Sequence, residues 1–171
     1  MRKDEKGFLI MQSQQKLSEH LGQQLLNANQ VLVTAESCTG GGVAAAITDI
    51  AGSSQWFDRA FVTYTNDAKQ EMIGVKADTL AQFGAVSEPV VIEMVQGALR
   101  SSHGSIGVAI SGIAGPGGGS EIKPVGTVCF AWADKNGWQK VTTEHFTGDR
   151  ASVRQQAIFY ALQTISEYLS E

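Results

Sequence analysis

The chain has 171 residues with a formal net charge of −4 at pH 7, and 43% of its residues are apolar and 18% charged. This length and composition are typical of one globular domain with a sizeable hydrophobic core. The negative net charge, without a cluster of lysine or arginine, argues against a nucleic-acid surface. No run approaches the roughly 18 apolar residues that a membrane-spanning helix requires, so we expect no membrane partner.

The beginning of the chain mixes charges of both signs with a short apolar run. We expect an irregular N-terminal tail over residues 1–10 and a single domain over residues 11–171. The apolar run before Gln12 has only five residues, too few for a secretory leader, so we expect a cytoplasmic protein. Cys38 and Cys129 lie far apart and lack the Cys-x-x-Cys or Cys/His spacing of a zinc site, so we expect no metal.

Hydrophobic periodicity predicts alternating helices and strands. An amphipathic surface helix carries Leu17, Leu21 and Leu25 at four-residue spacing. Strands are expected over residues 31–34, 56–65, 106–110, 124–133 and 138–146, and further helices over residues 43–50, 66–74, 78–83, 88–103 and from residue 150 onward. The last two strands flank an Asn-Gly turn, which indicates a hairpin. This order predicts a three-layer α/β/α sandwich with a mixed, mostly parallel sheet.

Residues 31–42 depart most clearly from ordinary core sequence, because a strand runs into a small polar corner with three glycines before the next helix. Such a turn places Ser37 at the carboxyl end of the strand and directs the following backbone N–H groups toward a ligand. Ser37 could attack a substrate or hold an anion there. Alternatively, Ser37 or Thr39 only caps the helix, and these residues by themselves leave both interpretations open.

Two further strands end in polar or glycine-rich corners. Tyr64 ends the second strand, and Lys69 lies about one helical turn beyond it, where it either reaches the same sheet edge or is an ordinary solvated lysine. Residues 111–120 contain five glycines, which indicates a flexible loop or the close approach of a ligand. Arg150 and Arg154 lie at the positive end of the last helix, where either an anion stabilises them or both face solvent.

Five motifs occur in the order 34–41 (TAESCTGG), 62–69 (VTYTNDAK), 84–88 (GAVSE), 111–116 (SGIAGP) and 124–128 (PVGTV). Together they resemble the CinA C-terminal domain family, over a match that runs from about residue 12 onward. The stand-alone bacterial members of this family are nicotinamide mononucleotide deamidases, which form nicotinic acid mononucleotide and ammonia in NAD recycling. The resemblance implies this activity, with a pyridine nucleotide as the substrate.

The resemblance also implies roles for individual residues. Ser37 corresponds to the nucleophile, with Tyr64 and Lys69 as its catalytic partners. No histidine lies in the three corners, so a lysine whose pKa is lowered would serve as the base. Backbone N–H groups after Ser37 would hold the oxyanion, and Arg150 and the glycine loop would meet the phosphate. The implied substrate-binding residues are Cys38, Thr39, Gly40, Gly41, Ser111, Gly112, Ala114, Gly115 and Arg150.

We further expect a homo-oligomer, in the form of a dimer, that uses neither metal nor cofactor. The competing hypothesis is a non-catalytic nucleotide-binding or regulatory module linked to competence or stress. The complete set of Ser37, Tyr64 and Lys69 favours the enzyme, because a binding module has no need of all three.

Overall fold

The computed structural model describes residues 2–171. Its single sheet has the strand order β2-β1-β3-β4-β5. The strands are β1 (Leu32–Glu36), β2 (Phe57–Val62), β3 (Ile106–Gly112), β4 (Thr127–Asp134) and β5 (Gln139–His145). Strand β1 pairs in parallel with β2 and β3, whereas β4 is antiparallel to both β3 and β5. Only β4 therefore runs against the other strands, and the expected mixed, mostly parallel sheet is confirmed.

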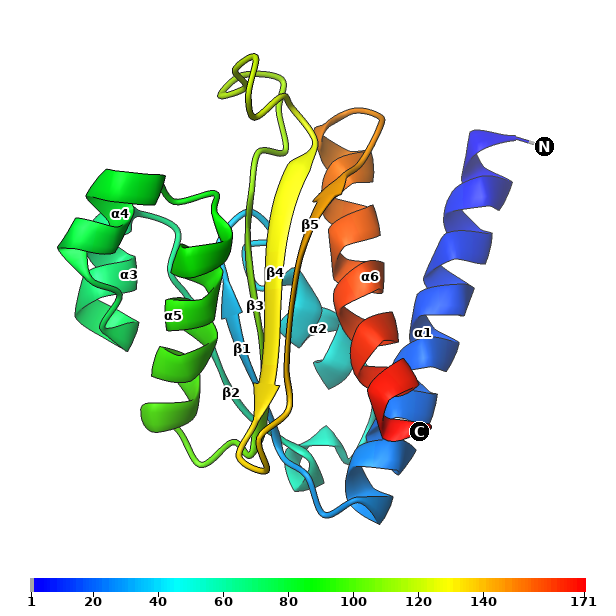
Figure 1. The fold of residues 1–171 in the computed structure, drawn as a ribbon. Helices are drawn as coiled ribbons and strands as arrows, with labels where there is room; N and C mark the ends of the chain where they lie inside the picture. Colours follow the sequence, from blue (N-terminus) through cyan, green and yellow to red (C-terminus); the bar gives the residue numbers. More distant parts are fainter. Residues whose placement is uncertain (1) are drawn as a thin grey trace.

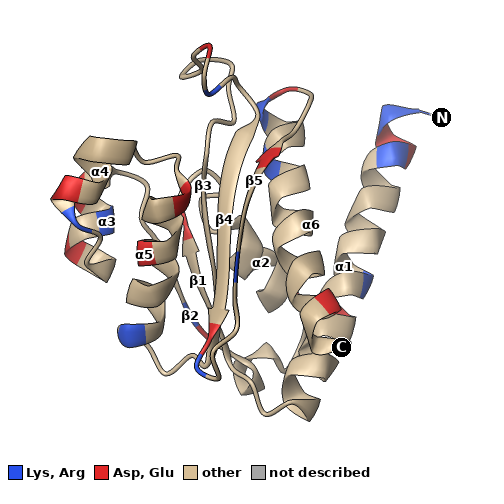
Figure 2. Cartoon of the chain, in the orientation of Figure 1, with Lys and Arg blue, Asp and Glu red and all other residues tan. Residues whose placement is uncertain are grey.

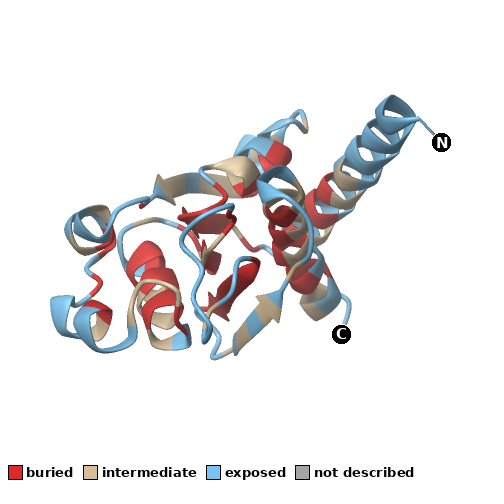
Figure 3. Ribbon diagram, turned by 90° about the horizontal axis from the view of Figure 1, so that it is seen from above, coloured by how far each residue is buried: buried red, intermediate tan, exposed pale blue. Residues whose placement is uncertain are grey.

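Helices cover both faces of the sheet, as Figure 1 shows. One face carries α3 (Asn66–Ile73), α4 (Ala77–Phe83) and α5 (Glu88–Arg100), and the other carries α1 (Lys3–Asn27), α2 (Gly42–Thr48) and α6 (Arg150–Leu169). A short 3₁₀ turn, η1 (Ser53–Gln55), precedes β2. Buried residues are concentrated in the sheet and on the inward sides of the helices (Figure 3). The three-layer sandwich expected from the order of elements is confirmed.

The two faces of the sheet differ in the size of their side chains. Phe130 and Trp132 of β4 point toward α6, whereas the intervening Ala131 points toward α5. The Trp132 indole Nε1 donates a hydrogen bond to the Ala161 carbonyl oxygen at 3.1 Å, and Tyr160 packs edge-on against the Phe130 ring. Because buried aromatic groups with a satisfied polar atom pack in one orientation, these contacts fix the position of α6 on the sheet.

The beginning of the chain corrects one expectation. Residues 3–10 are the first turns of α1, so an irregular tail is wrong for residues 3–10; Met1 lies outside the described residues. The Glu5 carboxylate accepts the backbone N–H of Arg2 at 3.1 Å, which satisfies an N-terminal donor of the helix. Residues 2–13 are exposed throughout, including Phe8 and Met11, as Figure 3 shows. Helix propensity and this end contact extend α1 over these exposed first turns, beyond the part of the helix that Leu21 and Leu25 bury against the core.

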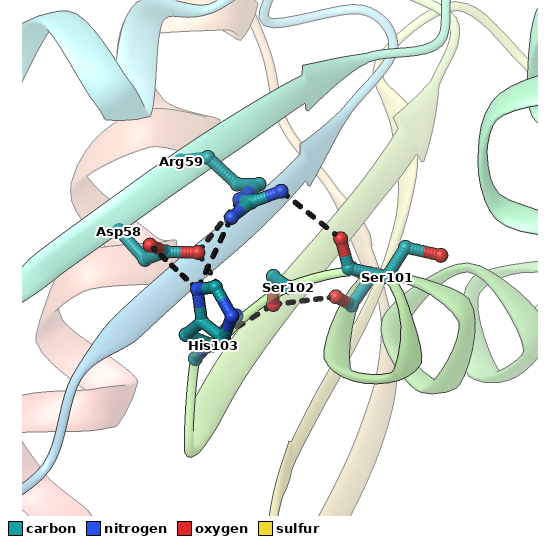
Figure 4. A network of polar contacts seen from close by, with 7 residues as sticks. Asp58, Arg59, Ser101, Ser102 and His103 are labelled. Carbon is teal, nitrogen blue, oxygen red and sulfur yellow. Dashed lines mark hydrogen bonds and ion pairs between the residues drawn. The ribbon is translucent and has the colours of Figure 1, made fainter.

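A polar network joins β2 to the loop after α5 at the amino edge of the sheet (Figure 4). The Asp58 carboxylate accepts hydrogen bonds from Arg59 Nε at 2.7 Å and from the His103 backbone N–H at 3.0 Å. Arg59 also donates to the Ser101 carbonyl oxygen at 3.3 Å. Desolvation alone would raise the pKa of Asp58, but these hydrogen bonds hold it below its usual value. The network ties together the sheet edge opposite to the end where β1 leads into α2.

Basic and acidic residues are interspersed over the described elements, as Figure 2 shows. Both arginines of α6 lie in its first two turns. Across residues 2–171, no helix combines the length and apolar character needed to cross a bilayer.

Candidate active site

Ser37, Thr63 and Ser111 lie side by side where the three parallel strands end. Glu36 is in register with Ile110 of β3. Beyond this pair the ladder continues, because the Ser37 N–H donates to the Ile110 carbonyl at 3.0 Å and the Thr63 N–H donates to the Glu36 carbonyl at 2.9 Å. A cavity of about 260 Å³ opens at this edge, and both Ser37 and Ser111 line it. The cavity is therefore at the carboxyl end of the strands, where open α/β sheets place their ligands.

Lys69 is buried and lies against Ser37. Its Nζ atom is 3.1 Å from Ser37 Oγ, 2.8 Å from the Thr63 carbonyl oxygen and 3.4 Å from the Tyr64 carbonyl oxygen. Helix α3 brings it there because the Thr65 hydroxyl, which caps the helix, accepts the Ala68 N–H and begins the helix one turn before Lys69. The interpretation of Lys69 as a solvated lysine is wrong, since only 1% of its surface is exposed.

The surroundings of Lys69 favour the neutral amine. Burial lowers the pKa of Lys69 below 10.5, a shift that a charge on Cys38 would oppose. No carboxylate within residues 2–171 forms an ion pair with Lys69. A neutral amine has two N–H groups and one lone pair, which match the two carbonyl oxygens and the hydroxyl of Ser37. This arrangement allows the lone pair to accept the Ser37 proton.

Cys38 lines the cavity beside Ser37, but its thiol is a poor nucleophile. Burial raises the pKa of Cys38 to about 11, although its own backbone N–H and the Arg154 guanidinium act in the opposite direction. The thiol therefore stays protonated near pH 7, and a protonated thiol reacts slowly. Of the two neighbours, Ser37 is the one with a base in hydrogen-bonding contact.

Tyr64 reaches the cavity with its side chain, while its carbonyl oxygen lies near Ser37 and Lys69. The side chain lines the cavity and is 58% exposed. Its hydroxyl accepts a hydrogen bond from Arg150 Nη2 at 3.1 Å. The Ser37 hydroxyl can donate to the Tyr64 carbonyl oxygen at 3.5 Å. Among residues 2–171, no hydrogen bond joins the Tyr64 hydroxyl to Ser37 or Lys69.

The turn after Ser37 is built on Glu36, a residue that the sequence reasoning missed. Glu36 is fully buried, and its Oε1 atom accepts the Thr39 hydroxyl at 2.7 Å and the Val43 N–H at 2.9 Å. Its Oε2 atom accepts the Ala44 N–H at 3.0 Å and the Thr34 hydroxyl at 3.1 Å. The carboxylate thus satisfies the first N–H groups of α2 and meets the positive end of its dipole.

This arrangement decides the earlier question of capping. Neither Ser37 nor Thr39 caps α2: the N-cap position is Gly41, and the capping acceptor is the carboxylate of Glu36. Gly40 and Gly41 have φ angles of +59° and +92°, which glycine adopts without strain. Ser37 is therefore free of the structural role that the simpler interpretation gave it.

Replacing Glu36 by glutamine should lower the free energy of unfolding by about 2–4 kcal/mol. The amide keeps one acceptor oxygen but turns an NH₂ group toward backbone and hydroxyl donors, which are left buried without partners. Chemical denaturation of Glu36→Gln would measure the loss. Glu71→Gln, on an exposed position of α3, is the matched control. A loss below about 1 kcal/mol in Glu36→Gln would contradict this account of the turn.

The two arginines of α6 both donate hydrogen bonds to oxygen atoms of the protein. Arg150 Nη1 donates to the Gly115 carbonyl oxygen at 2.8 Å, in addition to the contact of Nη2 with Tyr64. Arg154 donates to the carbonyl oxygens of residues 38 and 39. The Asp149 side chain accepts the Ser152 N–H at 2.9 Å and supplies the negative charge expected at the start of α6.

Most of the residues expected at the site line the cavity, and some do not. Those that line it are Ser37, Cys38, Tyr64, Lys69, Ser111, Gly112, Ala114 and Arg150. Thr39, Gly40, Gly41 and Gly115 do not line it, because the Thr39 hydroxyl turns inward to Glu36 and the glycines supply turn geometry. Asn66, Ala85 and Val86 line the cavity but were not among the expected site residues, although all three lie within the motifs quoted from the sequence.

Across residues 2–171, no group of three or more His, Cys, Asp or Glu side chains is placed to hold a metal ion.

The fold and the cavity define a class of α/β sandwich proteins that pair a serine with a buried lysine at the carboxyl edge of the sheet. The chain belongs to the CinA C-terminal domain family, whose model matches residues 14–169. The family that the sequence motifs resemble is thereby confirmed.

Similar proteins of this family come from several bacteria. The chain is 61% identical over 150 residues to nicotinamide-nucleotide amidohydrolase PncC of Escherichia coli strain K12. The aligned region covers 88% of this chain and 91% of the relative. It is 46% identical over 157 residues to the Pseudomonas putida protein of the same name, and this alignment covers 91% of this chain and 96% of the relative. The crystal structure of competence/damage inducible protein CihA from Agrobacterium tumefaciens superposes with a TM-score of 0.89 at 42% identity, over 92% of this chain and 96% of that one.

Proposed function

We propose that this protein is a hydrolase that cleaves the amide of nicotinamide mononucleotide, releasing nicotinic acid mononucleotide and ammonia within NAD recycling. The observation that carries the proposal is the 3.1 Å contact between the buried Lys69 amine and the Ser37 hydroxyl. An amide is a poor electrophile, so a serine that attacks it needs a base within hydrogen-bonding distance. The printed name of the 61% identical Escherichia coli relative supports the choice of substrate.

In the first half of the proposed reaction, Ser37 Oγ attacks the carboxamide carbon while Lys69 Nζ accepts the hydroxyl proton. The carbonyl oxygen becomes an oxyanion, which the backbone N–H groups of Cys38 and Thr39 stabilise. Among the described residues, neither N–H group donates to a backbone carbonyl. The C–N bond then breaks, Lys69 returns its proton to the leaving nitrogen, and ammonia departs from an acyl-serine ester.

In the second half, a water molecule attacks the ester carbon and gives its proton to the neutral Lys69 amine. The C–O bond to Ser37 breaks, the serine recovers its proton from Lys69, and the product leaves as a carboxylic acid that ionises in water. The same lysine therefore acts as a base and then as an acid in each half, which requires a pKa nearer to neutral than that of free lysine.

The remaining cavity residues suit a pyridine nucleotide. Ala85, Val86 and Ala114 supply apolar surface for a flat ring beside the amide. Ser111 is 99% buried at the end of β3 and lines the same cavity, where its hydroxyl can bond a polar group of the substrate. Arg150, the cavity residue with a permanent positive charge, is our candidate for the nucleotide phosphate.

Arg150→Ala should weaken the binding of the nucleotide more than that of the riboside, which lacks the phosphate, because a charge-assisted hydrogen bond contributes about 1.5–3 kcal/mol. The expected result is a rise of about 10- to 100-fold in the KM for nicotinamide mononucleotide and little change for nicotinamide riboside. Comparing kcat/KM for both substrates tests this. Equal losses would show that Arg150 serves only to hold Gly115 and Tyr64 in place.

Incubation of the purified protein with nicotinamide mononucleotide, with ammonia and nicotinic acid mononucleotide measured together, tests the proposed function. We expect equal amounts of both products. Binding of the nucleotide in calorimetry without release of ammonia would favour the non-catalytic nucleotide-binding module instead. If the nucleotide is neither bound nor hydrolysed, the choice of substrate is overturned.

A further inference from the structure

Arg154 holds the turn that follows Ser37 from the side of α6. Its Nε atom donates to the Cys38 carbonyl oxygen at 3.0 Å, and its Nη2 atom donates to the Thr39 carbonyl oxygen at 3.1 Å. We propose that Arg154 is a positioning residue, which sets the direction of the Cys38 and Thr39 N–H groups so that both can stabilise the oxyanion. This inference rests on the proposed amidase function and adds a residue that does not line the cavity.

The planarity of the peptide bond carries the effect from the carbonyl oxygens to the N–H groups. In a trans peptide the C=O of one residue and the N–H of the next point in opposite directions. Arg154 holds the Cys38 carbonyl, and so it fixes the direction of the Thr39 N–H. Arg154 also holds the Thr39 carbonyl, which directs the Gly40 N–H toward the Ser37 carbonyl oxygen at 3.0 Å. That bond fixes the peptide between Ser37 and Cys38, and with it the Cys38 N–H.

Arg154 adds donors from outside the turn to the two bonds that the turn makes within itself, from the Gly40 and Gly42 N–H groups. Gly40 and Gly41 both have positive φ angles, so the turn is rich in residues that rotate easily. Glu36 accepts the Thr39 hydroxyl and the first N–H groups of α2, and as an acceptor it cannot hold the carbonyls of residues 38 and 39. Arg154 is the side-chain donor to both of these carbonyls, and the Thr39 carbonyl also accepts the Gly42 N–H at 2.9 Å.

Arginine suits this task better than lysine. The rigid guanidinium presents its Nε and Nη2 protons side by side, which fits two successive carbonyl oxygens, whereas an ammonium group acts as a single point. A cation in the first turns of α6 is disfavoured by the helix dipole by roughly 0.3–1 kcal/mol. No carboxylate of residues 2–171 forms an ion pair with Arg154 to offset that cost. Both of its hydrogen-bond partners belong to the turn.

The test compares Arg154→Lys and Arg154→Ala with Arg59→Ala. Arg59 is the matched control, because it also donates to a backbone carbonyl but lies at the opposite edge of the sheet. We expect kcat to fall about 10- to 10³-fold in both Arg154 variants, the range for a weakened oxyanion site. We expect the KM to stay within about threefold, because ground-state binding does not use the oxyanion contact. Methylguanidinium added to Arg154→Ala should restore part of kcat, and Arg59→Ala should match the wild type.

Two outcomes would overturn the proposal. One is a kcat within about twofold of wild type in Arg154→Lys and Arg154→Ala, with only the melting temperature lowered; Arg154 would then simply anchor α6. The other is a rise in KM at unchanged kcat, which would place Arg154 in substrate binding.

A measurement independent of turnover separates this proposal from the proposed function. The amide signals of residues 39 and 40 in ¹H–¹⁵N spectra should shift in Arg154→Lys and stay unchanged in Arg59→Ala, because the preceding carbonyls lose the hydrogen bonds from the guanidinium. Unchanged signals in Arg154→Lys would overturn the positioning role even if the wild type releases no ammonia. Shifted signals without wild-type turnover would leave Arg154 as the residue that orients the turn and reject only the amidase.

Discussion

Ser37→Ala should abolish ammonia release from nicotinamide mononucleotide, with kcat lower by on the order of 10⁴-fold or more. In the proposed mechanism the substitution removes the atom that would form the acyl ester, and the adjacent Cys38 cannot replace it, because burial raises the pKa of its thiol to about 11 and keeps it protonated. Single-turnover assays with excess enzyme would detect even a small residual rate.

The fold should survive this change. The Ser37 side chain contacts only the Lys69 amine and the Tyr64 carbonyl among the described hydrogen bonds, and Glu36 and Arg154 still hold the turn. Calorimetry should give nucleotide binding within a few-fold of wild type. Ser101→Ala, an exposed serine at the opposite edge, is the control for removing a hydroxyl. Turnover near the wild-type level in Ser37→Ala would move the chemistry to another residue.

Lys69→Arg should reduce kcat by about 10²- to 10⁴-fold, the usual contribution of a general base. The arginine places a permanent positive charge near Ser37 and does not give up its proton in proteins. Lys69→Ala should be about equally inactive, with the loss in kcat and only a small change in KM. A large fraction of wild-type turnover in Lys69→Arg would show that position 69 serves as a fixed charge, and the Tyr64 hydroxyl would become the candidate base.

The pH profile follows from the same contact. Burial lowers the pKa of Lys69 below 10.5, and the base is active only when it has lost its proton. Activity should therefore rise with increasing pH and reach a plateau above the lowered pKa. The rising limb should disappear from the residual activity of Lys69→Ala. A profile that falls as the pH rises through this range would contradict a neutral lysine.

The meeting of Ser37 and Lys69 could be predicted because it depends on rules that act along the sequence. Parallel strands deliver the residues after their carboxyl ends to one edge, and a helix that begins at residue 66 returns its first turn to that edge. The hairpin between β4 and β5 was predictable for the same reason, since an Asn-Gly pair marks its turn.

The partners of the turn could not be predicted, because a backbone carbonyl or N–H group leaves no trace in the sequence. For Arg150 and Arg154 the sequence left an anion and solvent as alternatives, and it did not indicate their carbonyl and hydroxyl acceptors in distant segments. Glu36 did offer a signal, as an acidic residue that ends a strand of mostly apolar residues. A carboxylate in that place needs several donors, and the N–H groups of the next helix are the nearest supply.

The residues of the site are synthesised in a fixed order, and Arg154 is made long after Ser37 and Lys69. Ser37 and Lys69 belong to the first half of the chain, but Arg154, which holds the turn after Ser37, belongs to α6, and α6 packs against α1 (Figure 1). At a ribosomal speed of about 5–20 residues per second, Arg154 is made roughly 6–23 s after Ser37. During that interval Ser37 and Lys69 have been made, but Arg154, which donates to the turn after Ser37, has not. A nascent chain is therefore expected to remain a poor catalyst until α6 has left the ribosome and docked.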